Sequence, residues 1–435
     1  MKKLLKNCSL KRTIGVKSMF LVLYILVLSD TSLFAQSTPE ATTPKPAVEE
    51  KWYDTFKIRG YLQIRYNRLL ETNEDLKCEQ CDKSWGENGG IFIRRARIIF
   101  SGQISKQVYF YVQPDFASSV SSTSLSSVSS TSLSPVSSTS LNFTQLRDAY
   151  MDIGIDKENE FRIRLGQSKI PFGFANLQSS QNRLPLDRDD ALNSAFSNER
   201  DMGAFFYWAP SKKRKLLANL VKTGLKGSGD YGVFAFGVFN GQTANKPDLN
   251  NELHIVGRLS YPIELGSQII EASVQGYSGK FVLAKDQISS GVKTTKDKIY
   301  TDQRVAGSFI LYPKPFGIQA EYNIGEGPEF NKATDSIENK DLSGGYVILS
   351  YMTKVRSHIF IPFVRYQYYN GGKKHELDAR SYEVEETEIG LEWQPVPQFE
   401  FVAMFTISKR KFEDKVLRDN YQDGSLLRLQ AQINF

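Results

Sequence analysis

The sequence predicts an all-β fold, a transmembrane antiparallel β-barrel of about sixteen strands. Segments of alternating apolar and polar residues recur through most of the 435-residue chain. Such alternation is typical of strands with one side facing lipid and the other facing water. Short and long connections between the segments also alternate, as they do at the two ends of a barrel. After Leu28, no apolar run reaches the length of a transmembrane helix.

Residues 1–35 are predicted to be an export signal peptide. A basic region comes first, an apolar core from Met19 to Leu28 follows, and the small residue Ala35 comes near the end. The core is too short to span a bilayer as a helix, so cleavage near Ala35 is expected rather than an uncleaved anchor. Residues 36–54 are rich in Pro and Thr and are expected to form a flexible periplasmic lead-in to a barrel over 55–435.

The charge of the chain is nearly balanced once the signal peptide is set aside. The full chain has 55 Lys and Arg against 48 Asp and Glu, of which the signal peptide holds six and one. The remainder has 49 against 47, so its net charge is close to zero. Any preference for anions must therefore come from where the charges lie, because the total supplies almost none.

The first strands are predicted within residues 56–70, 91–104 and 105–117. By alternation, the first two strands turn four arginines inward: Arg59, Arg65, Arg95 and Arg97. Residues 118–141 then repeat an eight-residue Ser-rich unit three times. Such a tract cannot bury enough surface to fold alone, so we expect a disordered external loop there.

The hairpin over residues 161–203 is expected to carry function. Its first strand has an apolar face and a basic face, and the basic face is formed by Arg162 and Arg164. The long polar loop of residues 169–200 is expected to fold into the lumen, because long loops of this kind are usually functional. The loop adds three candidates for an anion path: Lys169, Arg183 and Arg188. Lys373 is expected in an external loop away from this constriction.

The strand count depends on residues 213–224, which could form a strand. Including them gives seventeen strands and leaving them out gives sixteen, an even number with both barrel ends on the periplasmic side. Residues 211–230 are therefore assigned to an enlarged periplasmic turn. The last strand alternates from Leu427 to Phe435. Phe435 is expected to be the signal that the barrel assembly machinery recognises.

Seven motifs support a family resemblance: RGYLQIRYNR, FIRRARIIFSGQI, YVQPDFA, LRDAYMDI, LGQSKIPFG, NERDMG and GVFNG. With the last strand they span residues 56–435, and the chain resembles the phosphate-selective porin O and P family. The resemblance implies a trimeric sixteen-stranded barrel in the outer membrane of a Gram-negative bacterium. It further implies that the third loop folds into the pore, that basic residues conduct anions such as phosphate, and that Lys169 is a residue of the constriction.

The predicted lumen has basic residues on its early strands and acidic residues on its later ones. The acidic residues that alternation turns inward are Glu321, Glu386, Glu388 and Glu392. Two interpretations stay open. The charges could form a field across the lumen that favours anions along the basic side, or they could be the polar lining of any water-filled barrel. Arginine favours oxyanion contact, because its planar fork can bind two oxygens.

The cysteines and histidines predict no catalytic or metal site. Cys78 and Cys81 form a C-x-x-C pair in an exposed loop of an exported chain, which favours a disulfide. A redox site would need a βαβ context that is absent. The three histidines have no metal-ligand spacing. No Gly-rich loop leads from a strand into a helix, so no cofactor, nucleotide or nucleic acid is expected.

The sequence therefore predicts a passive outer-membrane channel for small anions or small polar solutes, and no enzyme. The expected partners are outer-membrane lipid, the barrel assembly machinery and two further copies in a homotrimer. Two alternatives remain at this point. A surface adhesin or binding barrel would use its long loops, and a soluble periplasmic β protein would lack an outward apolar band.

Overall fold

The computed structural model describes residues 51–70, 90–118 and 143–435. The predicted signal peptide, residues 36–50 of the lead-in, both cysteines of the candidate disulfide (Cys78 and Cys81) and residues 119–141 of the Ser-rich segment lie outside the described residues. Within the described ranges, no helix is long and apolar enough to cross a membrane.

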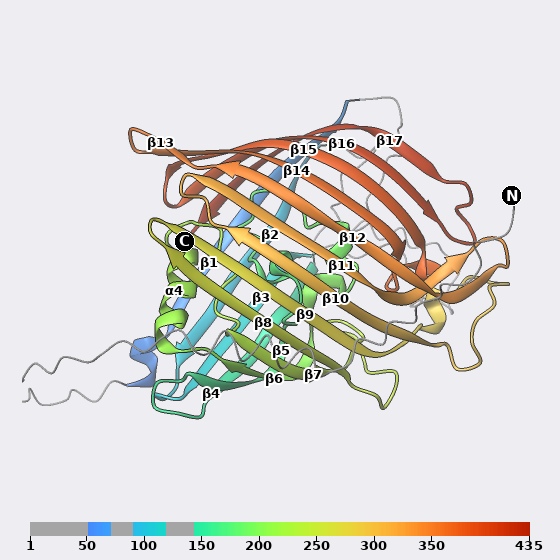
Figure 1. The fold of residues 1–435 in the computed structure, drawn as a ribbon, viewed down its shortest axis with the longest axis horizontal. Helices are drawn as coiled ribbons and strands as arrows, with labels where there is room; N and C mark the ends of the chain where they lie inside the picture. The colour runs from blue at the N-terminus through green and yellow to red at the C-terminus, as the bar shows by residue number, and fades with distance from the viewer. Residues whose placement is uncertain (1–50, 71–89, 119–142) are drawn as a thin grey trace, which may run out of the picture. The chain divides into compact units, whose positions relative to one another are not determined.

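The described residues form one antiparallel sheet that closes on itself (Figure 1). Its strands are β1 (Lys57–Leu69), β2 (Gly90–Gln103), β3 (Val108–Ser118), β4 (Phe143–Gly154), β5 (Phe161–Lys169), β6 (Arg200–Trp208), β7 (Phe234–Phe239), β8 (His254–Leu265), β9 (Gln268–Val282), β10 (Ile299–Leu311), β11 (Phe316–Asn331), β12 (Ser336–Tyr351), β13 (Thr353–Val355), β14 (His358–Gly372), β15 (Ser381–Val396), β16 (Phe399–Glu413) and β17 (Tyr421–Asn434). The helical segments are η1 (Trp52–Thr55), α2 (Phe174–Leu177), α3 (Asp190–Asn193), η3 (Ser197–Glu199), α4 (Ser211–Lys222), η4 (Lys285–Gln287) and η5 (Leu377–Ala379).

Closure comes from β1, which pairs with both β2 and β17. The short strand β13 continues β12, because both pair with β14 in one register: Ser350 lies opposite Phe363 and Thr353 lies opposite Phe360. The seventeen strand segments therefore make a wall of sixteen strands. The predicted antiparallel barrel with sixteen strands is confirmed.

Connections at one end of the barrel are short. Two residues, 266–267, join β8 to β9, and another two, 397–398, join β15 to β16. The chain starts and finishes its circuit at this end, where Gly60 and Phe435 exchange backbone hydrogen bonds of 2.7 and 3.0 Å. The opposite end carries longer segments, among them residues 170–199. This is the alternation of turns and loops that the sequence predicts.

Residues 211–230 connect β6 to β7 and are not a strand, which agrees with their assignment to an enlarged turn. The sequence did not predict that most of this connection is the helix α4. The helix buries Leu216, Leu217 and Leu220 on one side, while Lys212, Lys215 and Lys222 are exposed on another. This separation of apolar and basic residues is an amphipathic pattern with helical spacing.

The two faces of the wall differ as predicted. On β1, Gln63 and Arg65 point inward and are fully buried, whereas Ile58 and Ile64 are 62% and 42% exposed. On β17, Arg428 is buried and Ile433 is 48% exposed. Such large apolar side chains would be costly to leave in water around an entire sheet, and they suit a lipid environment. This outward band argues against the soluble alternative.

The barrel interior is filled by the segment between β5 and β6, residues 170–199, here called the inserted loop. Its apolar residues Ile170, Phe172 and Phe196 are buried. They belong to one cluster with inward-facing wall residues, among them Phe205 and Tyr277. The inserted loop therefore has a core of its own against the wall, and its position depends on packing as well as on charges.

Candidate functional site

The inserted loop is fastened to the closure of the barrel by Asp187. Its carboxylate accepts hydrogen bonds from Arg65 of β1 at 3.0 Å and Arg428 of β17 at 2.5 Å. Arg94 of β2 forms a third, longer ion pair at 3.4 Å. Burial would raise the pKa of Asp187, but the surrounding arginines, Arg65 foremost, hold it well below its usual value. A buried carboxylate with this many guanidinium partners stays ionised and fixes the loop.

A second fastening lies at α3. Asp190 accepts from Arg410 of β16 at 2.9 Å and from Lys373 at 2.6 Å. Lys373 belongs to the connection between β14 and β15 and is only 2% exposed. Lys373 lies in a connection at the external end of the barrel, as expected, but the expectation that it lies away from the constriction is wrong. The connection that carries it turns inward, because Asp190 offers its ammonium a buried counter-charge.

Further wall arginines bind the backbone of the inserted loop. Arg365 of β14 donates to the carbonyl of Asp187 at 2.7 Å. Arg304 of β10 donates to the carbonyl of Ala191 at 3.0 Å. These contacts satisfy carbonyl groups that a buried irregular segment would otherwise leave unpaired. The loop is thus held from several sides of the barrel.

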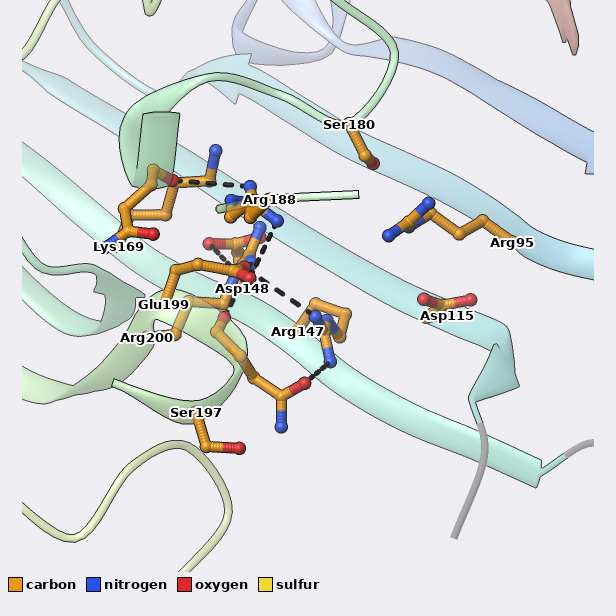
Figure 2. A network of polar contacts seen from close by, with 12 residues as sticks. Arg95, Asp115, Arg147, Asp148, Lys169, Ser180, Arg188, Ser197, Glu199 and Arg200 are labelled. Atoms are coloured by element: carbon orange, nitrogen blue, oxygen red, sulfur yellow. Dashed lines mark hydrogen bonds and ion pairs between the residues drawn. The ribbon is translucent and has the colours of Figure 1, made fainter. Parts of the chain in front are cut away.

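At the foot of the loop, acidic and basic side chains form a continuous network (Figure 2). Arg188 and Arg200 converge on Glu199, with nitrogen–oxygen distances of 2.7 and 2.8 Å. Arg200 also binds Asp148 of β4 at 2.9 Å. Arg188 donates in addition to the carbonyl of Gln178 at 2.9 Å. Arg188 is therefore engaged in holding the loop, although the sequence analysis placed it in the anion path.

Lys169 lies beneath the inserted loop at the end of β5. Its ammonium donates to the carbonyls of Leu177 and Gln178, each at 2.8 Å. Among the described residues it has no ion pair with a carboxylate. The residue that the family resemblance assigns to the constriction thus contacts the inserted loop through two backbone carbonyls, and the carboxylates of Glu199 and Asp148 act on it from farther away.

Arg183 is the loop cation with the fewest contacts. One nitrogen donates weakly to the carbonyl of Leu186 at 3.4 Å, whereas Nε and Nη1 are buried without a hydrogen-bond partner. Burial and the neighbouring charges of Arg188 and Arg94 hold the pKa of Arg183 well below its usual value. Buried guanidinium donors without an acceptor are unfavourable, so this position is suited to an anion that supplies one.

Arg95 of β2 faces the same part of the lumen and is close enough to Arg183 for the two charges to repel. Its Nη1 donates to the amide oxygen of Gln63 at 2.9 Å, and it forms no ion pair with any carboxylate of the described residues. Nearby, the hydroxyls of Tyr61 and Ser180 lie 2.6 Å apart. We call Arg95 and Arg183 the unpaired pair.

A β-bulge explains why Arg94 also reaches the lumen. The register between β1 and β2 shifts here, because Gln63 lies opposite Arg95 whereas Ile64 lies opposite Ile93. The extra residue, Arg94, binds Asp187 of the inserted loop. Simple alternation would turn Arg94 toward lipid. The consecutive arginines of the FIRRARI motif are the signal that could have indicated a bulge.

Each of the remaining predicted arginines has a different partner. Arg97 is held by Asp115 at 2.7 Å. Arg164 binds Asp152 at 2.7 and 2.9 Å. The last two differ in exposure: Arg162 is buried and lies 2.9 Å from Asp230, whereas Arg59 is exposed near the ring of Tyr111. The predicted site residues therefore line one barrel interior, but they do not form one cluster.

The acidic residues of the later strands are also paired. Glu388 binds Arg365 and Arg428, each at 2.7 Å. Glu321 accepts the backbone N–H groups of Phe174 and Ala175 at 2.6 and 2.8 Å. The other two acidic residues have basic partners as well: Glu386 binds Arg410 and Glu392 binds Lys226. The structure thus lacks a simple basic side and acidic side, because the later strands carry inward arginines that the sequence analysis did not use.

No group of three or more His, Cys, Asp or Glu within residues 51–70, 90–118 and 143–435 could hold a metal ion. Several arginines hold the inserted loop, whereas the unpaired pair forms no ion pair with a carboxylate of the described residues.

Comparisons with known proteins agree with this picture. The family model described as phosphate-selective porin O and P matches residues 71–435. The outer membrane channel DcaP of Acinetobacter baumannii superposes with a TM-score of 0.53 at 13% identity, covering 89% of this chain and 99% of DcaP. OmpF of Salmonella typhi, solved in complex with daunomycin, gives a TM-score of 0.50 at 11% identity, covering 87% of this chain and 97% of OmpF. At these identities the likeness concerns the fold alone. A comparison with curated proteins gave no match.

Proposed function

The chain belongs to the phosphate-selective porin O and P family and is an outer-membrane porin of a Gram-negative bacterium, and we propose that it passes small anions, phosphate among them, in preference to cations. The resemblance drawn from the sequence motifs is confirmed by the family match. The family and the fold indicate a channel rather than an enzyme.

The observation that carries the proposed anion preference is the unpaired pair. Arg65, Arg97, Arg164 and Arg428 form ion pairs with carboxylates, whereas Arg95 donates only to an amide oxygen and Arg183 only to a carbonyl. Arg304 also lacks an ion pair among the described residues, but it donates to two oxygens of the inserted loop. In a narrow and partly desolvated passage, an unmatched cation attracts an anion much more strongly than it would in open water. A passing anion would supply the acceptor that the buried Nε and Nη1 of Arg183 lack.

Phosphate suits this position by its chemistry. Its oxygens can accept two parallel hydrogen bonds from one guanidinium, and such charge-assisted bonds are stronger than neutral ones. The hydroxyls of Tyr61 and Ser180 lie beside the pair and can donate as well as accept. Because the mature chain is nearly neutral, selectivity would be a local property of this passage rather than of the whole surface.

The test is the reversal potential of single channels in a salt gradient. The wild-type protein is expected to show the sign of anion selectivity, and added phosphate is expected to reduce its chloride current by competing for the same passage. A reversal potential near zero or of cation sign would contradict the proposed preference. The porin assignment would stand, because it does not depend on selectivity.

A homotrimer is the oligomer that the family resemblance implies, and it stays a prediction. Chemical cross-linking of the detergent-solubilised protein, followed by denaturing electrophoresis, would test it. A surface-binding role would depend on long loops, two of which lie outside the described residues, and no observation on the described residues favours it.

A further inference from the structure

The helix α4 turns its apolar face into the periplasmic mouth of the barrel. Leu217 and Leu220 are buried in one cluster with Ile269 of β9 and with Ile310 and Tyr312 at the end of β10. On β9 and β10, these apolar residues lie on the inward-facing side of the strand, where polar residues of the lumen also lie. An apolar inward patch would face water in an open barrel end, so the wall is built to receive the helix.

The chain beyond α4 crosses to the opposite wall. Lys226 forms a buried ion pair of 2.6 Å with Glu392 of β15, which lies on the far side of the barrel from β7. The carbonyl of Lys226 accepts from the side-chain amide of Gln178 in the inserted loop at 2.6 Å. The ring of Phe174, also in the loop, packs edge-on against Tyr312, with ring centres 6.3 Å apart. Residues 211–231, here called the periplasmic insert, therefore contact the inserted loop from below.

The base of the periplasmic insert is firmly anchored. Arg214 binds Asp230 at 2.9 Å and donates to the carbonyl of Asn159 in the turn between β4 and β5 at 2.7 Å. Lys213 donates to the carbonyl of Pro262 on β8 at 3.0 Å. These contacts join the start of α4 to two neighbouring parts of the wall. The helix is thus a fixed part of the mouth rather than a loosely attached turn.

An open space remains on the other side of the mouth. A cavity of about 240 Å³ lies between the wall and the insert, and its lining includes Arg59, Ile99, Gln181, Asn182, Val221 and Asn434. Arg59 and Asn434 come from the wall at β1 and β17, Asn182 comes from the inserted loop, and Val221 comes from α4. The cavity therefore lies where the inserted loop, the insert and the barrel closure meet.

We propose that the periplasmic insert is a second constriction, which confines the outlet of the channel to the passage between Val221 and Arg59. Solute that has passed the inserted loop leaves along β1 and β17, because α4 and Lys226 fill the side toward β8, β9 and β15. The exposed guanidinium of Arg59 then stands at this outlet. This inference uses the channel activity that the family membership shows and does not depend on the proposed anion preference.

The test places single cysteines on α4 in a background in which Cys78 and Cys81 are replaced by serine. Val221→Cys lines the proposed outlet, and Asn219→Cys, at an exposed position on the opposite side of the same helix, is the control. A negatively charged methanethiosulfonate reagent is added to channels already inserted in a planar bilayer, so folding is not at issue. Modification of Val221→Cys is expected to lower single-channel conductance by roughly half or more, because pore width limits the current. Asn219→Cys should change little.

Mass spectrometry of the treated protein confirms that each thiol has reacted. Full modification of Val221→Cys with unchanged conductance would overturn the proposal, and so would equal losses at both positions. A Val221→Cys thiol that does not react at all would also count against it, because the outlet must be open to solvent. Conductance is the readout here, whereas reversal potential tests the anion preference, so the two proposals can fail separately.

Discussion

Asp187 and Arg183 lie in the inserted loop and Arg95 faces them from β2, yet Asp187 and the unpaired pair differ in the partners that the protein supplies. Asp187 brings a carboxylate to Arg65 and Arg428, and the three groups satisfy one another. Arg95 and Arg183 form no ion pair with a carboxylate of the described residues. The comparison shows that an inward arginine is not by itself a selectivity residue. Its role depends on whether the protein already supplies its counter-charge.

The largest expected effect is on the paired side of this comparison. Asp187→Asn keeps the shape of the side chain but leaves Arg65 and Arg428 buried without their shared carboxylate. Breaking a buried pair in this way costs roughly 3–5 kcal/mol. Urea unfolding followed by heat-modifiable gel mobility measures the loss. Asp286→Asn, an exposed position, is the control and should change little. Equal stability of the two variants would show that Asp187 does not hold the loop.

A smaller loss is expected at the second fastening. Lys373→Met removes the ammonium that binds Asp190 but leaves Asp190 its bond to Arg410. We expect a loss of about 1.5–3 kcal/mol, the range for one hydrogen bond to a charged group. Lys246→Met, at an exposed loop position, is the matched control. If both variants unfold at the same urea concentration, the buried contact at Lys373 contributes nothing measurable.

Asp189 gives a pH-dependent test of how the loop is held. Burial and the neighbouring Glu321 raise its pKa to about 7. In an unfolded chain the carboxyl ionises near pH 4, so between about pH 4 and pH 7 the folded state holds a proton that the unfolded state has lost. Stability therefore falls as the pH rises through this window and changes no further above it.

The Asp189→Asn variant should remove this pH dependence while keeping the hydrogen bond from the backbone of Leu192, because asparagine is also a good helix cap. The unfolding midpoint of the wild type is expected to drop more between pH 5 and pH 8 than that of the variant. Parallel pH profiles would mean that Asp189 titrates normally.

The smallest expected effect concerns the two cysteines. Cys78 and Cys81 are predicted to be bridged, and serine at both positions should leave conductance nearly unchanged, because the barrel supplies the stability. Two thiols that react without reductant would refute the bridge. A collapse in conductance would instead place this loop in the passage.

The strands of the barrel wall could be predicted from the sequence more completely than the contacts in the barrel interior. Alternation along Leu427–Phe435 was enough to predict a strand with one apolar and one polar face, because the two faces of a barrel strand meet lipid and water. Arg94 was missed because one bulge reverses the alternation. Lys373 was misplaced because a loop that turns inward has the same composition as one that turns outward. The sharing of Asp187 by Arg65 and Arg428 joins opposite ends of the chain, and no local pattern records such a contact.

The helix α4 also shows that a local sequence pattern does not reveal which distant residues it will contact. Its residues alternate poorly as a strand, and the strand count correctly assigned them to a turn. Their helical amphipathic pattern became meaningful only once Ile269 and Ile310 were seen to receive it. An apolar residue on the lumen side of a strand is the sequence signal that could have indicated an inserted element.

The most direct test compares two arginines of the inserted loop that differ in their partners. Arg183→Gln and Arg188→Gln remove the same charge, but Arg188 is bound to Glu199 at 2.7 Å and Arg183 has no carboxylate partner among the described residues. The reversal potential in a salt gradient should shift toward cations in Arg183→Gln, with its unfolding midpoint nearly unchanged. Arg188→Gln should lose stability and shift the reversal potential less. Equal shifts, or a larger shift for Arg188→Gln, would contradict the division between arginines that hold the loop and arginines that select the solute.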